Sequence, residues 1–155
     1  MRRKDREITD RKTIDDIISR CKVCRIALCE NGQPYVLPLN FGYDGKHLYF
    51  HSATVGKKIE MIKQNNRVCF EFDILHEITT ADKPCEWSAK YESVVGSGTA
   101  EFIESQQEKS KALDYILRQY GGSFSDLNGS SLSSVVIIRV NIVSISGKKS
   151  EVSSQ

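Results

Sequence analysis

The sequence His51-Ser52-Ala53-Thr54-Val55-Gly56-Lys57-Lys58 marks the point where an expected strand passes into an expected helix. Before it, apolar and polar residues alternate over residues 46–51, which is typical of a half-buried strand. After it, Ile59 and Ile62 are spaced as on one face of a short helix that ends near residues 64–66. The junction itself contains two hydroxyl side chains, one glycine and two adjacent lysines.

This junction has the chemistry of a phosphate site. The first turn of a helix presents unpaired N–H groups and a partial positive charge, and anions bind there. Without an anion, Lys57 and Lys58 are misplaced, because a cation at a helix N-terminus costs a few tenths of a kcal/mol, up to about 1 kcal/mol. From these eight residues alone, a phosphate site and a solvated surface turn are equally good interpretations.

The composition is that of one ordinary globular domain, and we treat residues 1–155 as a single unit. The net charge of +2 gives no electrostatic case for binding nucleic acid or an anionic membrane. No apolar run is long enough to span a bilayer. Five cysteines, an odd number without a secretory signal, favour reduced thiols and a cytoplasmic location.

The periodicity predicts mainly β structure. Strands are expected at residues 23–29, 35–43, 46–51, 67–74, 91–103 and 135–145. Helices are expected at residues 14–21, at a short segment that contains Ile59 and Ile62 and ends near residues 64–66, and at residues 107–120. Residues 1–10 are expected to be a loose N-terminal arm and residues 146–155 a tail. Because tight turns join most strands, the pattern predicts a six-stranded antiparallel β-barrel with flanking helices, not alternating βαβ units.

Three irregularities suggest where a ligand could lie. Pro38 cannot donate to a ladder, so its strand should lie at a sheet edge or break its pairing there, with Asn40 facing an opening. Residues 76–88 form an expected loop whose length suggests that it covers a site or an interface. Gly96 and Gly98 within an expected strand indicate a bulge, a bend or a ligand against the backbone.

Two other patterns are weaker. Cys21 and Cys24 match C-x-x-C, but the pattern falls at the end of an expected helix, where the dipole raises a thiol pKa, so packing as small apolar residues is the better interpretation. His47 and His51 are about 13 Å apart on an extended strand and cannot share a metal ion. No metal site is therefore expected.

The remaining candidates have two interpretations each. His51 adjoins the possible phosphate site, and it is either a histidine satisfied by a backbone carbonyl or a residue with a role in reactivity. Trp87 and Tyr91 could stack on a bound ring, or they could be core or interface aromatics.

Seven segments, taken in order, resemble a known family: Tyr35–Tyr43, Leu48–Ala53, Gly56–Glu60, Val68–Glu71, Trp87–Ser88, Tyr91–Gly98 and Ile145–Ser150. The chain resembles the FMN-binding split-barrel proteins related to pyridoxamine 5′-phosphate oxidase. More narrowly, it resembles the branch that contains the 5-nitroimidazole-resistance (Nim) flavoproteins. The resemblance covers nearly the whole chain beyond residue 10.

The resemblance implies a six-stranded split barrel of Greek-key type that forms a homodimer, with FMN in the groove between protomers. The residues that it implies for FMN are Pro38, Leu39, Asn40, Phe41, His51, Ser52, Lys57, Lys58 and Ser93. His51 would contact flavin or substrate and is the catalytic candidate. Trp87 and Tyr91 would line the substrate pocket, from either protomer.

The function implied is FMN-dependent reduction of small, electron-poor organic compounds such as nitroimidazoles. The chain departs from the oxidases in two ways. Both phosphate-site cations are lysine where the oxidases include arginine, so they supply charge but not a planar fork. The C-terminal substrate-binding segment of the oxidases is not found, which counts against pyridoxamine phosphate as substrate. The alternatives are an enzyme of the pyridoxamine 5′-phosphate oxidase type and a non-catalytic protein that binds or stores flavin.

Overall fold

The structure is a computed structural model of the chain, and it describes residues 3–123 and 135–150. The helices of this part are η1 (Lys4–Arg6), α1 (Arg11–Arg20), α2 (Lys57–Gln64), η2 (Pro84–Glu86) and α3 (Gln106–Gln119). The strands are β1 (Glu7–Ile8), β2 (Cys24–Glu30), β3 (Gln33–Leu39), β4 (Gly42–Tyr43), β5 (His47–Ser52), β6 (Arg67–Thr79), β7 (Ser88–Ile103) and β8 (Val136–Ser150).

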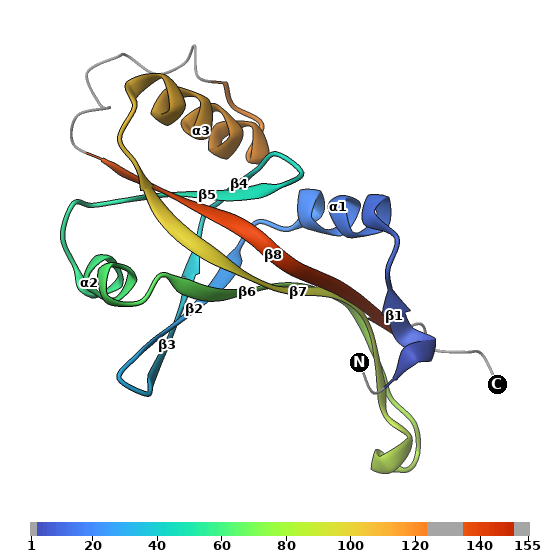
Figure 1. The fold of residues 1–155 in the computed structure, drawn as a ribbon. Coiled ribbons are helices and arrows are strands. Elements are labelled where there is room, and N and C mark those ends of the chain that lie inside the picture. Colours follow the sequence, from blue (N-terminus) through green and yellow to red (C-terminus); the bar gives the residue numbers. More distant parts are fainter. Residues whose placement is uncertain (1–2, 124–134, 151–155) are drawn as a thin grey trace.

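The strands form one antiparallel sheet with the order β3-β2-β6-β7-β8-β5-β4, and β1 pairs with β8. The sheet curls around a core but stays open, because no pairing within the described residues joins the outer edges of β3 and β4 (Figure 1). The expected mainly β, antiparallel split-barrel architecture is confirmed. The sheet has eight strands instead of the expected six, because β1 and β4 are additional two-residue strands.

The inner face of the sheet holds the main core. Helix α1 begins at an N-cap, where the Asp10 side chain accepts the N–H of Thr13 at 2.8 Å, and its buried stripe covers one end of this core. Helix α2 covers another part, and α3 lies beside β4 and β5 (Figure 1). At the centre, the rings of Phe41 and Phe72 meet edge to face, with centroids 4.8 Å apart.

The predicted strand over residues 35–43 is divided in the structure. β3 ends at Leu39, and the chain then turns to pair with β5 as β4. The side chain of Phe41 is fully buried, and its N–H donates to the Tyr120 hydroxyl at 3.1 Å instead of to a ladder. The predicted edge position of β3 is confirmed.

The prediction of loose segments at the two ends of the chain, residues 1–10 and 146–155, is wrong in part. Ile8 is buried, and β1 pairs with Gly147 and Lys148 near the end of β8. The two segments therefore order each other, since the backbone groups of each form hydrogen bonds with those of the other. Residues 1–2 and 151–155 lie outside the described residues.

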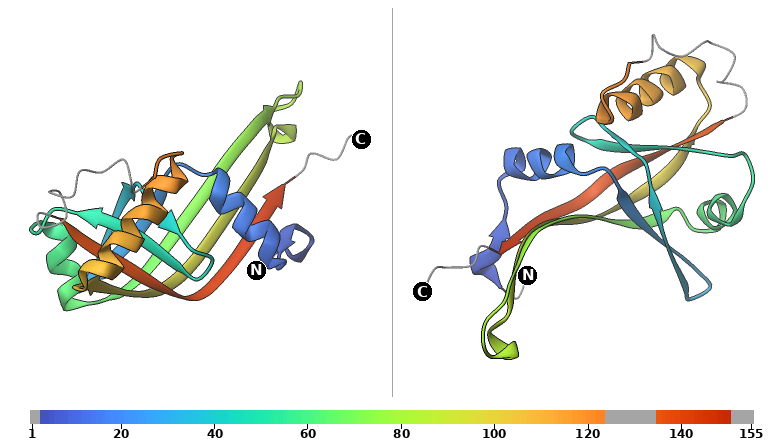
Figure 2. Two further views of the ribbon diagram at one scale, coloured as in Figure 1. Left: turned by 90° about the horizontal axis from the view of Figure 1, so that it is seen from above. Right: turned by 180° about the vertical axis from the view of Figure 1, so that it is seen from behind.

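The prediction of a loop over residues 76–88 is also wrong. β6 continues to Thr79 and β7 starts at Ser88, so the two strands project from the body as a hairpin (Figure 2). We refer to residues 75–91 as the projecting hairpin. Two features concealed the alternation of this segment in the sequence. Its composition is polar, and a bulge between Leu75 and Glu77 shifts the register.

The two glycines of β7 have structural reasons. The register between β7 and β8 shifts at Ser97/Gly98, which confirms the bulge interpretation there. At Gly96, an added Cβ would lie 2.2 Å from the Phe70 ring and 2.6 Å from the Ser144 carbonyl oxygen. Gly96 therefore lets a core ring and a neighbouring strand approach the backbone closely.

Candidate functional site

The expected phosphate site lies where β5 passes into α2. β5 ends at Ser52, which is buried, and the chain reaches the helix through Gly56 at φ 133° and ψ 165°. Only glycine adopts this backbone conformation readily. The Gly56 carbonyl accepts the N–H groups of Ile59 and Glu60, so those of Lys57 and Lys58 precede the helical ladder.

The two lysines of this turn have no carboxylate partner among the described residues. Lys57 is exposed, and its Nζ lies 4.5 Å from the centroid of the Tyr35 ring. Lys58 is half-buried, and burial lowers its pKa. A half-buried cation without a counter-ion favours the binding of an anion. We refer to Ser52, Lys57 and Lys58 as the phosphate seat.

The contact of Lys57 with Tyr35 joins the phosphate seat to β3. Pro38 follows Tyr35 at roughly 10 Å along the strand, at the usual rise of an extended chain, and Asn40 comes directly after the last residue of β3. Pro38 and Asn40 are exposed, whereas Leu39 is half-buried and Phe41 is fully buried. A mononucleotide can therefore reach from the phosphate seat to the exposed end of β3.

His51 precedes the phosphate seat on β5, opposite Ile137 of β8, and its side chain is exposed. Within the described residues it makes no recorded hydrogen bond, so the structure gives no support to the interpretation that a backbone carbonyl satisfies it. Its catalytic role stays a prediction.

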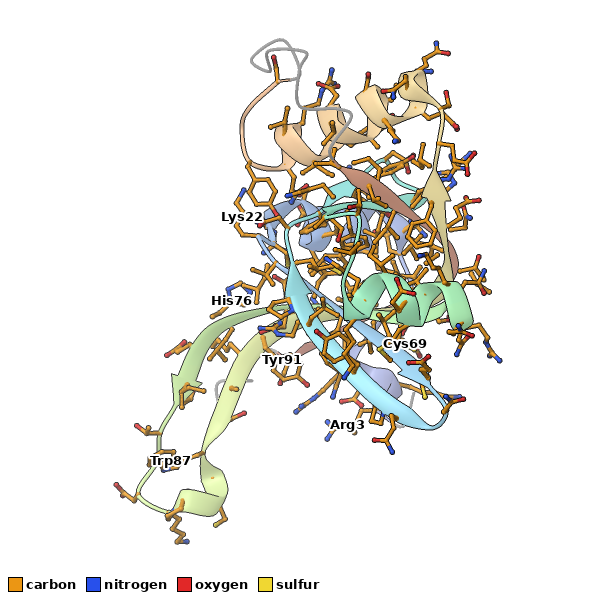
Figure 3. The ribbon with its side chains drawn as sticks, turned by 90° about the vertical axis from the view of Figure 1, so that its left-hand side faces the viewer. Arg3, Lys22, Cys69, His76, Trp87 and Tyr91 are labelled. Atoms are coloured by element: carbon orange, nitrogen blue, oxygen red, sulfur yellow. The ribbon has the colours of Figure 1, made fainter. Side chains whose placement is uncertain are left out.

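The remaining candidates form a second group around β7. Ser93 and Tyr91 lie two positions apart on this strand and face the outer side of the sheet, and Trp87 directly precedes the strand and is exposed. The β7 residue in register with His51 is Ile103, since both lie opposite Ile137 of β8, and it is ten residues or about 33 Å along the strand from Ser93. Trp87 lies further still, on the projecting hairpin, far from α2 (Figure 3). One chain therefore does not bring this group to the phosphate seat.

A charged cluster on the outer face was missed by the sequence analysis. The Arg25 guanidinium donates to Glu71 at 3.1 Å and also to Asp73, and Lys148 lies opposite Ser93 on β8. We refer to Arg25, Glu71, Asp73 and Lys148 as the charged belt. The alternation of β6 had placed Glu71 and Asp73 outward, but their partners depend on the strand order, which the sequence does not reveal.

A polar cluster around the turn between β4 and β5 was also missed. Asp44 accepts the N–H groups of Lys46 and His47, the His47 ring nitrogen at 2.9 Å and the Tyr49 hydroxyl at 2.7 Å. Burial opposes ionisation of Asp44, but these hydrogen bonds outweigh it and hold its pKa below the usual value. The cluster fixes the turn, and His47 borders a hollow of about 520 Å³ beside Arg11.

The C-x-x-C cysteines are buried, which confirms their packing role. Burial raises the pKa of Cys21 to about 11, with a smaller contribution from Asp73, and burial raises that of Cys24 further. Within residues 3–123 and 135–150, no three His, Cys, Asp or Glu side chains are placed to hold a metal ion. No helix in the same ranges is long and apolar enough to cross a membrane.

This burial predicts a selective thiol reaction. In the folded protein at pH 8, diluted until it is monomeric, an alkylating reagent should modify the exposed Cys29, Cys69 and Cys85 much faster than Cys21 and Cys24, which stay protonated and enclosed. Peptide mass spectrometry of a timed reaction measures the order, and denatured protein, in which all five thiols react, is the control. Fast modification of Cys24 in the native protein would contradict the burial.

Comparison with known proteins gives a consistent set of relatives. A family model described as pyridoxamine 5′-phosphate oxidase matches residues 10–149. The chain is 36% identical to a candidate 5-nitroimidazole antibiotic resistance protein from Bacteroides thetaiotaomicron, over 92% of this chain and 86% of that one, with a TM-score of 0.80. It is 26% identical to an FAD-binding protein from Mesorhizobium loti, over 94% and 98% of the two chains, with a TM-score of 0.70.

Two further similarities are more limited. An FAD and heme binding protein from Mycobacterium smegmatis shares the fold, with a TM-score of 0.85 over 94% of this chain and 74% of that one, at 24% identity. A curated relative from Rhizobium meliloti, described as an uncharacterized protein, is 27% identical over 64 residues. That match spans 41% of this chain and 42% of the relative, so it carries no functional information.

Proposed function

Because this chain belongs to the pyridoxamine 5′-phosphate oxidase family, we propose that it is an FMN-dependent oxidoreductase that reduces small, electron-poor organic compounds, with nitroimidazoles as the model substrate class. The observation that carries the proposal is the phosphate seat, where two lysines without a carboxylate partner lie beside the exposed end of β3. The similarity to the Bacteroides protein favours the nitroimidazole class over others.

The residues of this chain fit a flavin mononucleotide. Lys57 and Lys58 would neutralise the phosphate, and the N–H groups of the first turn of α2 would donate to it. The backbone around Pro38 and Asn40, at a sheet edge, would address the polar side of the ring. When bound, the flavin supplies the electron transfer, and these side chains supply binding and orientation.

FMN is proposed in preference to FAD because the phosphate seat is small. Lys57 and Lys58 are adjacent, in one helical turn, which suits one phosphate group. The FAD-binding protein from Mesorhizobium loti makes FAD the alternative cofactor. Titration of the purified apoprotein with each flavin decides between them.

We also place the protein in the cytoplasm as a homodimer that encloses the flavin between two copies. The separation of Ser93, Tyr91 and Trp87 from the phosphate seat supports this arrangement, since both groups can line one site only if two chains contribute. The alternatives of an oxidase of pyridoxamine phosphate and of a flavin store make different predictions in the assay below.

An absorption spectrum followed by a reduction assay tests the proposal. We expect the protein to bind added FMN. A reduced nicotinamide cofactor or another electron donor should then bleach the bound flavin by reducing it, and a nitroimidazole should restore the colour by accepting the electrons. Formation of an aldehyde from pyridoxamine phosphate under oxygen would instead support the oxidase, and bound flavin that no donor reduces would support the store. A protein that binds neither FMN nor FAD would refute all three.

A further inference from the structure

The projecting hairpin has one apolar face. The bulge at His76 offsets the alternation of β6, so Leu75, opposite Tyr91, and Ile78, opposite Ala89, point to the same side. Their exposed fractions are 58% and 53%, and that of Trp87 at the hairpin tip is 54%. The other face is polar and carries the ion pair of Lys90 with Glu77 at 2.8 Å.

Beyond Tyr91, no other strand of the same chain pairs with the projecting hairpin within the described residues. The last pairing of β7 with β8 is Tyr91 with Ser150, and β2 pairs with β6 only as far as Glu71, so the hairpin has two free edges within the described residues. It projects away from the helices and the core (Figures 1 and 2). An isolated two-stranded hairpin is marginally stable in water, and an exposed apolar row usually marks an interaction surface.

A groove of about 470 Å³ lies on the same outer face of the sheet. It is lined by Ala27, Leu28, Cys29, Pro34, Asn65, Arg67, Val68, Cys69, Ser97, Gly98, Thr99 and Val143. Val143 is 74% exposed, and Arg67 is the one charged residue of this lining. The groove is therefore mostly apolar and open to a partner.

The three outer-face features follow one another along β6. Cys69 lies in the groove, Glu71 and Asp73 lie in the charged belt, and Leu75 begins the apolar face of the hairpin. A two-fold axis that passes through the belt exchanges the two ends of this series. It would place the hairpin of each copy over the groove of the other, in an isologous contact.

We propose that the projecting hairpin of each protomer docks into the outer-face groove of a second copy of this chain. The proposal rests on the homodimer of the proposed function, and it specifies which surfaces form that dimer. A second copy is the occupant because one chain carries both the projecting apolar element and the groove on the same outer face, so that a two-fold axis can exchange them.

The charges of the hairpin tip and of the groove also favour a second copy of this chain as the occupant. The hairpin tip over residues 80–87 contains Asp82, Lys83 and Glu86, a net charge of −1, and Lys83 already pairs with Glu86 at 3.6 Å. Arg67 of the groove has no ion pair within the described residues. The belt, with two cations and two carboxylates, is neutral as a set and can face its own copy across the axis.

Native thiols provide the first test. Cys85 is exposed at the hairpin tip, and Cys29 and Cys69 are exposed in the groove, whereas within one chain Cys69 is about 33 Å from Thr79 along β6. A short bismaleimide applied to a mixture of isotopically light and heavy protein should link Cys85 of one copy to Cys69 or Cys29 of another. Mass spectrometry identifies mixed-isotope links, and the Cys85→Ser variant, which should lose them, is the control.

A matched pair of double variants provides the second test. Leu75→Gln with Ile78→Gln changes the apolar face, and Glu77→Gln with Lys90→Gln places the same residues on the polar face of the same hairpin. We expect the first pair to raise the dimer dissociation constant about 100-fold and the second to leave it nearly unchanged. Sedimentation equilibrium measures both, against the 17.5 kDa mass of one chain.

Failure of this inference differs from failure of the proposed function. A dimer that both double variants retain, without links from Cys85 to the groove, would refute the hairpin contact while leaving flavin binding intact. A monomer in the unmodified protein would refute it as well. Loss of FMN binding and turnover in a dimer that does form these links would refute the proposed function alone.

Discussion

Replacing both Lys57 and Lys58 by alanine should weaken FMN binding by about 10²- to 10⁴-fold. A hydrogen bond to a charged group contributes about 1.5–3 kcal/mol, so the loss of two amounts to about 3–6 kcal/mol. Fluorescence titration of the apoprotein measures the dissociation constant, because flavin emission changes on binding. Lys63→Ala, at the other end of α2, is the matched control, since Lys63 pairs with Glu60 at 3.3 Å; it should bind FMN like the unmodified protein.

The same double variant should not destabilise the apoprotein. Lys57 and Lys58 lie in the first turn of α2, where the helix dipole disfavours cations, and burial lowers the pKa of Lys58. A lysine whose pKa is lower in the folded state disfavours folding at pH values where it is charged. The free energy of unfolding without FMN should therefore stay the same or rise slightly. A fall of several kcal/mol, or unchanged FMN affinity, would show that these lysines serve the fold instead.

The lowered pKa of Lys58 also sets a pH dependence. The ammonium group binds phosphate, so FMN affinity should fall as rising pH removes its proton. Because the pKa lies below 10.5, this fall should begin at a lower pH than for an ordinary lysine.

The substitution Gly96→Ala should destabilise the fold by about 3 kcal/mol. The new methyl group would meet the Phe70 ring on one side and the Ser144 carbonyl oxygen on the other, and the carbonyl cannot move without distorting β8. Chemical denaturation measures the free energy of unfolding. Native-like stability would mean that β7 and β8 separate more easily than their register indicates.

Gly122→Ala is the matched control for Gly96. At Gly122 the nearest atom to an added Cβ is the Leu117 carbonyl oxygen at 3.6 Å, which is ordinary van der Waals contact. This variant should be neutral or slightly more stable, since alanine reduces the conformational entropy of the unfolded chain.

Much of the sheet could be predicted because local chemistry decides it. Asn31 and Gly32 both have positive φ, as the Asn-Gly pair predicts for a tight hairpin. The alternation of Val68, Phe70 and Phe72 gives the buried face of β6 correctly. Such signals need only neighbouring residues.

Features that depend on distant partners could not be predicted. β1 exists because the end of β8 is available to pair with it, and β4 exists because the chain turns toward β5 after Leu39. The projecting hairpin was missed because its bulge breaks the period of two and its tip contains Pro84 and several charges. Periodicity describes a strand only while its register is regular.

In the candidate site, too, neighbouring residues could be predicted together, whereas contacts between distant segments could not. The phosphate seat is contiguous in sequence, so its residues could be named together, whereas the approach of Tyr35 to Lys57 joins segments 22 positions apart. The charged belt spans β2, β6 and β8, and its pairing follows from the strand order alone. Neither contact has a local signature.

The two prolines of β3 have a consequence for how this protein behaves at high concentration. A free sheet edge is a template for adding further strands, which is the first step of fibre formation. Pro34 and Pro38 remove two N–H donors from the exposed edge of β3, and both project where an added strand would have to lie. The chain can therefore leave this sheet edge uncovered without promoting lateral growth of the sheet into insoluble assemblies.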